Sequence, residues 1–131
     1  MKLLALDYGA ARTGVAVSDA SGTIARPLTV VERAGTDDGL RRIAALVGEQ
    51  EAEAVVVGLP LTLRGERGLQ AEETEQFVER LRAALDVPVE TYDERFTTML
   101  ATHAAGTAPE DARAAAHLLE SYLAWKSARR T

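Results

Sequence analysis

The sequence predicts an α/β fold in one domain covering residues 1–131, with a five-stranded mixed sheet and helices on both of its faces. Two short runs, residues 3–6 and 54–57, are apolar on both faces, which is typical of buried central strands. Two other stretches carry the 3.6-residue apolar period of amphipathic helices. The predicted order of elements is β-β-β-α-β-α-β-α, so we expect the first, fourth and fifth strands to run parallel.

The first three strands are predicted to form an antiparallel meander. They cover residues 2–7, 14–18 and about 23–33, and glycine-containing turns separate them. A helix follows, because Thr36 and the two aspartates after it form a helix start signal. Its predicted apolar stripe consists of Leu40, Ile43, Ala44 and Val47.

The second half of the chain alternates strands and helices. The strand at 54–57 stops at Gly58, and a helix over about 70–85 follows it. A fifth strand is expected over 87–94 and a short helix over about 97–105. The last helix begins with Thr107-Ala108-Pro109-Glu110, which combines the spacing of a capping box with an early proline.

Composition limits the classes of function. The chain has no cysteine, which excludes disulfides, zinc–thiolate sites and thiol catalysis and fits a reducing cytoplasm. Only four apolar residues lie between Lys2 and Asp7, too few for a signal peptide, and no stretch reaches transmembrane length. The net charge of -5 argues against a general nucleic-acid binder. Thirteen of the fifteen basic residues are arginines, however, and arginine is the side chain best suited to bidentate phosphate contacts.

Asp7 is the most informative residue, because it ends an apolar strand where an unpaired carboxylate is costly to desolvate. In open α/β sheets, ligands gather beyond the carboxyl ends of the parallel strands. Asp7 ends the first strand and Glu94 ends the fifth, so we expect both at the same edge of the sheet. The alternative for Glu94 is a solvated loop residue paired with Arg95.

Asp111 is predicted to join these two acids. Successive residues advance about 100° around a helix, so Asp111 shares a face with residues that should pack on the sheet: Ala115, Leu118, Tyr122 and Trp125. This placement directs Asp111 toward the strand ends. The alternative is a first-turn carboxylate that interacts favourably with the helix macrodipole.

Three convergent carboxylates predict a divalent-metal site. Ionised together they repel one another, and their pKa values would rise without a counter-cation. Hard oxygen ligands favour Mg²⁺ or Mn²⁺ over zinc, and such a site can activate water and stabilise the leaving alkoxide of a phosphodiester. Arg64 and Arg67, in a glycine-flanked loop, are candidates for phosphate contacts, and a solvated loop is the alternative for them.

Four segments of the chain match one known family when taken together. They are residues 6–19 with Asp7-Tyr8-Gly9 and Arg12-Thr13-Gly14, then Gly58-Leu59-Pro60-Leu61 with Gly65 and Gly68, then Asp93-Glu94-Arg95-Phe96-Thr97-Thr98, and last Asp111 with Ala114-Ala115, Leu118-Leu119 and Ser121-Tyr122-Leu123. They resemble the YqgF/RuvX family, a ribonuclease H-like group related to RuvC-type Holliday junction resolvases. The match runs almost end to end and keeps order and spacing through the first three segments.

The resemblance implies a ribonuclease H-like fold and metal-dependent nuclease activity. The acidic motif positions of the family fall on Asp7, Glu94 (or its neighbour Asp93) and Asp111. The task proposed for the family is 5′-end processing of precursor 16S rRNA, and Holliday junction resolution is the other proposed role. This chain departs from the family pattern in two ways. The stretch between Arg95 and Asp111 is shortened, and the Lys/Arg-rich segment common there is nearly absent. Glu120 stands where the last motif usually has a glutamine, and we do not count it as catalytic.

We therefore expect a cytoplasmic nuclease that uses Mg²⁺ or Mn²⁺ on structured RNA or branched DNA. Its expected phosphate contacts are Arg12, Arg64, Arg67 and Arg95. A homodimer would supply two sites for cutting two strands symmetrically. One rival is an actin-like nucleotide-binding ATPase, which opens with a similar Asp-x-Gly hairpin but needs two lobes. Another is a non-catalytic ribosome-assembly factor, which the acidic charge and the short basic segment favour.

Overall fold

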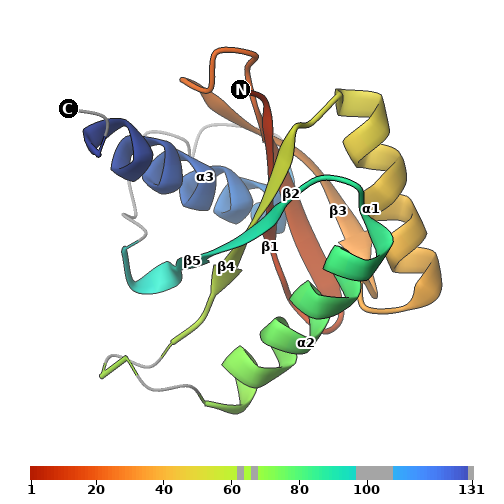
Figure 1. Cartoon of the computed structure of the whole chain (residues 1–131). Helices are drawn as coiled ribbons and strands as arrows, with labels where there is room; N and C mark the ends of the chain where they lie inside the picture. Colours follow the sequence, from red (N-terminus) through yellow and green to blue (C-terminus); the bar gives the residue numbers. More distant parts are fainter. Residues whose placement is uncertain (62–63, 66–67, 97–107, 130–131) are drawn as a thin grey trace.

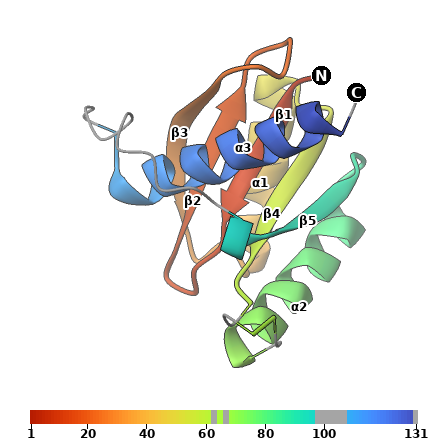
Figure 2. The same cartoon turned by 90° about the vertical axis from the view of Figure 1, so that its left-hand side faces the viewer.

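A computed structural model describes residues 1–61, 64–65, 68–96 and 108–129 of the chain. In chain order, the elements are β1 (Leu3–Asp7), β2 (Arg12–Ser18), β3 (Ala25–Glu32), α1 (Asp37–Gln50), β4 (Ala54–Leu59), α2 (Leu69–Ala84), β5 (Val89–Asp93), the short 3₁₀ helix η1 (Glu94–Phe96) and α3 (Glu110–Ala128). The five strands form one sheet in the order β3-β2-β1-β4-β5. Helices α1 and α2 cover one face of it and α3 covers the other (Figures 1 and 2). The predicted fold class is confirmed.

Strand β1 lies at the centre of the sheet and is buried along most of its length. It pairs antiparallel with β2, and β2 pairs antiparallel with β3, which confirms the predicted meander. On its other side β1 runs parallel to β4, and β4 runs parallel to β5. The carboxyl ends of β1, β4 and β5 therefore lie along one edge of the sheet.

The sheet separates two layers of core. Leu4 and Leu6 of β1 pack in the layer under α1 and α2, whereas Leu3 and Ala5 pack under α3. Small side chains line the sheet on the α3 side: Ala5, Ala16, Ala25 and Ala54. Because side chains alternate along a strand, Asp7 has the same direction as Leu3 and Ala5. The sheet thus presents the Asp7 carboxyl on the face that α3 covers.

Helix α1 begins where the sequence predicts. The Thr36 hydroxyl accepts a hydrogen bond from the backbone N–H of Gly39 at 3.1 Å, as an N-cap residue does. Leu40, Ile43 and Val47 of the predicted apolar stripe pack in or against the core, whereas Ala44 is only half-buried and Leu46, not predicted, is buried. The helix therefore presents a slightly rotated face to the sheet. Helix α2 agrees with its predicted range within a residue.

Helix α3 differs from the prediction at both ends. Pro109 occupies the N-cap position itself and makes no side-chain cap hydrogen bond, and Thr107, the first residue of the predicted capping box, lies outside the described residues. Trp125, expected on the buried face, is 42% exposed, although its ring contacts the rings of Tyr92 and Tyr122 with 5.8 Å between centroids in each pair. The predicted helix at 97–105 lies outside the described residues. In the described part of the chain, no helix has the length and apolar character needed to cross a membrane.

Candidate active site

Asp7 and Glu94 meet at the edge of the sheet where the parallel strands end. Asp7 is the last residue of β1, and Glu94 is the first residue of η1, directly after β5. Their side chains share a hydrogen bond. Strand β5 ends at Asp93, one residue earlier than predicted, so a 3₁₀ turn and not the strand itself aims the Glu94 carboxyl at Asp7. The predicted convergence of these two acids is observed.

Burial and mutual repulsion govern the protonation of this pair. The pKa of Glu94 is raised to about 8, first by burial and then by the hydrogen bond to Asp7 and the charges of Asp7 and Asp93. The pKa of Asp7 is also raised, by burial and by the charge of Asp111, while the hydrogen bond from Glu94 works in the opposite direction. With a pKa of about 8, Glu94 is mostly protonated at neutral pH and can donate a hydrogen bond to a carboxyl oxygen of Asp7.

Asp111 lies near this pair but is bound to an arginine. It stands in the first turn of α3, and its charge acts on Asp7. Its Oδ2 atom is 3.2 Å from Nε of Arg12, at the start of β2. The side chains of Arg12 and Asp111 are 67% and 37% exposed, so this ion pair lies at the open side of the site.

Asp93, the alternative to Glu94, is occupied elsewhere. Arg95 donates from Nε to Asp93 Oδ1 at 3.1 Å and from Nη2 to Oδ2 at 2.6 Å. The hydrogen bonds from Arg95 hold the pKa of Asp93 below its ordinary value. Arg95 therefore pairs with Asp93 and not with Glu94, and the structure favours Glu94 over Asp93 as the partner of Asp7.

The predicted phosphate contacts that the structure describes belong to segments around the acids. A Cβ atom placed on Gly65 would be 3.1 Å from Nη1 of Arg95, so the segment carrying the exposed Arg64 adjoins Arg95. Arg12 contacts Asp111, as described above. Arg67 lies outside the described residues. Three of the four predicted arginines thus belong to segments that border the acidic site.

The donor set suits a divalent cation, although its geometry is not that of a closed metal site. Among the residues that the structure describes, no three His, Cys, Asp or Glu side chains are arranged to hold a metal ion. Asp7 and Glu94 fit the chemistry, because a cation would offset the burial and the repulsion that raise the pKa of Glu94. Asp111 would need to exchange Arg12 for the ion. That all three acids hold a metal together stays a prediction.

Two glycines that the sequence analysis did not connect with the acids lie beside Asp7. The predicted strand end at Gly58 is wrong, because β4 continues through it to Leu59. A Cβ atom on Gly58 would be 2.5 Å from Oε1 of Glu94, and one on Gly14 would be 1.8 Å from the carbonyl oxygen of Asp111. The signal was present in the sequence, since both glycines follow the strand alternation that faces α3.

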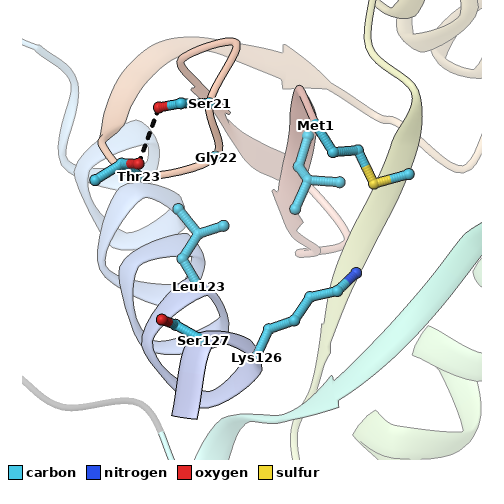
Figure 3. Close-up of a pocket in the computed structure, with 8 residues that line it drawn as sticks. Met1, Ser21, Gly22, Thr23, Leu123, Lys126 and Ser127 are labelled. Carbon is cyan, nitrogen blue, oxygen red and sulfur yellow. Dashed lines mark hydrogen bonds between the residues drawn. The ribbon is translucent and has the colours of Figure 1, made fainter. Parts of the chain in front are cut away.

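A pocket of about 140 Å³ lies at the far end of β1 from Asp7 (Figure 3). Met1 and Leu3 line it on the sheet side, and Leu123 and Lys126 from the end of α3 line it opposite. The N-terminal ammonium group donates to the carbonyl oxygen of Ala20 at 2.9 Å. None of the three predicted acids lines this pocket, so it is separate from the acidic site.

Sequence comparison finds close relatives of the chain. The profile of the RuvX family, described as Holliday junction resolvase, matches residues 1–125. A protein of Chloroflexus aurantiacus named as a candidate pre-16S rRNA nuclease is 50% identical over 99 residues, covering 76% of this chain and 65% of that protein. A protein of Syntrophus aciditrophicus with the same name is 40% identical over 132 residues, covering 94% and 88%. The chain thus matches less than two thirds of the length of the first relative.

Structural comparison supports the fold. RuvC of T. thermophilus, solved in complex with a Holliday junction substrate, superposes with a TM-score of 0.66 over 97% of this chain and 96% of that chain. The two sequences are 17% identical, so the likeness concerns the fold alone. It confirms the predicted ribonuclease H-like architecture.

Proposed function

The chain belongs to the RuvX family, and from this premise we propose that it is a divalent-metal-dependent endonuclease acting on structured nucleic acid. Its proposed task is 5′-end processing of precursor 16S rRNA, and its relatives are named as candidate pre-16S rRNA nucleases. The observation that carries the proposal is the paired Asp7 and Glu94 at the strand ends, with the Asp111 charge beside them.

Binding of a metal ion would require the three acids to give up their present hydrogen-bond and ion-pair partners. Asp7 and Glu94 would hold Mg²⁺ or Mn²⁺, and Glu94 would give up the proton that it now donates to Asp7. Asp111 would turn from Arg12 toward the ion. When bound, the cation supplies charge that neutralises the phosphate oxygens and lowers the pKa of the attacking water.

The arginines would position the nucleic acid. Arg12, once released by Asp111, has its guanidinium at the open side of the site and can donate to a phosphate. Arg64 and Arg95 lie on adjoining segments on the Glu94 side of the site. Arg67 belongs to the same proposal from its place in the sequence. We further propose a cytoplasmic location, in keeping with the absence of cysteine.

Cutting of branched DNA is the second candidate. The matching family profile is described as Holliday junction resolvase, which favours this activity. Symmetric cleavage of a junction needs two active sites, so this candidate includes a homodimer. Cleavage of an RNA end needs only one site.

A cleavage assay that offers both substrates side by side tests the proposal. Purified protein with Mn²⁺ or Mg²⁺ is given precursor 16S rRNA or a four-way DNA junction, with EDTA as the blank. We expect metal-dependent cutting of the RNA at its 5′ end. Cutting of the junction alone would select the second candidate. Failure on both substrates at saturating metal would refute the nuclease and leave the non-catalytic assembly factor.

A further inference from the structure

Asp7 stands between two glycines on the same face of the sheet. Asp7 of β1 pairs with Gly14 of β2. On the other side Leu6 pairs with Val57 of β4, so Asp7 and Gly58 are the next residues of these two parallel strands. All three face α3, because they continue the alternation of the residues that pack under that helix. Three neighbouring strands therefore present a Gly–Asp–Gly row.

Each glycine leaves the space that another acid occupies. A Cβ atom at Gly14 would lie 1.8 Å from the carbonyl oxygen of Asp111 and 2.3 Å from its carbonyl carbon. A Cβ atom at Gly58 would lie 2.5 Å from Oε1, 2.8 Å from Cγ and 3.0 Å from Cδ of Glu94. The first turn of α3 thus rests on Gly14, and the Glu94 side chain lies across Gly58.

Backbone conformation does not account for these two glycines. The glycines with positive φ among the described residues are Gly22 and Gly65. Gly14 and Gly58 lie inside strands with ordinary dihedrals, where glycine weakens the strand and usually marks a close approach. The need for space is the remaining reason for glycine at both positions.

We propose that Gly14 and Gly58 are positioning residues of the acidic site, which bring Asp111 and Glu94 to Asp7 by leaving room for them. This inference rests on the proposed function, since it concerns how the same three acids are assembled. Gly14 acts on the backbone of Asp111, so any side chain there must displace the start of α3. Gly58 acts on a movable side chain, so a methyl group there displaces the Glu94 carboxyl while the strands keep their places.

Gly58→Ala gives the sharper test. Mn²⁺ affinity, measured by electron paramagnetic resonance without nucleic acid, is expected to fall at least about 10-fold, as when a group that orients a metal ligand is lost. The melting temperature should stay near that of the wild type. Gly48→Ala is the matched control, because a Cβ atom at Gly48 meets nothing within 4 Å among the described residues. It should leave Mn²⁺ affinity unchanged.

A double-mutant cycle separates action through Glu94 from a general defect. In a Glu94→Gln background there is no Glu94 carboxylate left to displace. Gly58→Ala should therefore weaken Mn²⁺ binding less than it does in the wild type, and the two losses should be clearly less than additive. If Gly58→Ala lowers the melting temperature, Glu94→Ala in the same chain should restore it, because it removes all three atoms that the new methyl group meets.

Three results would overturn the inference. They are wild-type Mn²⁺ affinity in Gly58→Ala, fully additive losses in the double variant, and an unstable Gly58→Ala that Glu94→Ala does not restore. In each case a wild-type protein that still binds Mn²⁺ and cuts nucleic acid leaves the proposed function standing. If the wild-type protein binds no Mn²⁺, the proposed metal site is refuted, and the proposed role of the two glycines is refuted with it.

Discussion

A hydrogen bond between the carboxyl groups of Asp7 and Glu94 requires one proton shared by the two acids. Burial, followed by the hydrogen bond and the charge of Asp7, raises the pKa of Glu94 from its ordinary 4.5 to about 8. The folded chain therefore keeps a proton at pH 7 that the unfolded chain releases. A buried acid that stays neutral next to a charged one is typical of a site whose cation partner changes its protonation.

The stability of the metal-free protein should fall as pH rises between about 4.5 and about 8. The folded pKa of Glu94 lies above the unfolded one, so the folded state binds more protons within this window, and each pH step favours unfolding. The melting temperature measured in EDTA should decline more steeply for the wild type than for Glu94→Gln, which cannot titrate. Parallel declines in the two proteins would contradict the shared proton.

Asp7→Asn should abolish cleavage and leave the fold intact. We expect the cleavage rate to fall by more than about 100-fold, because losing a proposed metal ligand should cost more than losing a residue that only orients a ligand. Since the Asn side chain keeps an oxygen that can accept the hydrogen bond from Glu94, the melting temperature in EDTA should not fall. Asp38→Asn is the matched control, because Asp38 is 90% exposed on α1 and forms an ion pair only with Arg41 in the described part of the chain. Undiminished cleavage by Asp7→Asn with Mn²⁺ would refute its role.

Individual acids could be predicted only as far as strand ends could be placed. Asp7 and Glu94 were found because the carboxyl ends of parallel strands share an edge. The choice between Asp93 and Glu94 could not be made, since a shift of one residue in the end of β5 exchanges their directions. The ion pair between Arg12 and Asp111 joins two segments that are distant in sequence, and a local sequence pattern does not predict such a pair.

At the scale of elements, the end of α1 is strained. Glu51 ends the helix with φ of 54° and ψ of 42°, a left-handed conformation that glycine adopts readily and other residues adopt at a cost. Its carboxylate also stands at the helix C-terminus, where the macrodipole disfavours negative charge. The last turn contains no basic residue to offset it.

Glu51→Gly should therefore stabilise the protein by about 1 kcal/mol. Glu49→Gly removes the same charge inside the helix, where glycine is unfavourable, and should destabilise by about 1 kcal/mol. Urea denaturation of the two variants measures both changes. Equal effects in the two variants would show that charge, and not the left-handed backbone, determines stability at this end of α1.

Elements with a local signal were predicted well. Thr36 was recognised as a helix start from its own sequence and is the N-cap of α1. The first residue of α3 could not be predicted, because Thr107-Ala108-Pro109-Glu110 offers both a capping-box spacing and an early proline, and Pro109 is the N-cap. Which of two neighbouring start signals begins a helix depends on how that helix packs. The first turn of α3 packs on Gly14, which is distant in sequence, so local sequence does not determine where α3 begins.

At the scale of the whole molecule, α3 packs closely because the sheet beneath it carries small side chains. Ala5, Ala16 and Ala54 of the sheet meet Ala115 and Ala116 of the helix in one buried layer. This close packing brings the first turn of α3 down to the strand ends, where Asp111 joins the site. The overall topology was predictable from strand order and apolar runs, whereas the exposed Trp125 was not, since helical periodicity does not tell where a helix passes the edge of a sheet.

Mg²⁺ should raise the melting temperature of the whole chain. The ion binds the native arrangement of carboxylates, which the unfolded chain lacks, and at a hundredfold excess over Kd this adds about 2.7 kcal/mol. The expected shift is several degrees in a calorimetric scan at pH 7. Asp7→Asn should show little or none of it. A melting temperature that rises equally in both proteins would place the stabilising ion elsewhere.

The most direct test of a shared cation is a crystal structure of the wild-type protein grown with Mn²⁺, with the ion located by its anomalous scattering. We predict a Mn²⁺ peak coordinated by carboxylate oxygens of Asp7 and Glu94, with Asp111 turned away from Arg12 to join them. A structure at saturating Mn²⁺ in which no peak touches Asp7, and in which Glu94 keeps its hydrogen bond to Asp7, would contradict the metal site.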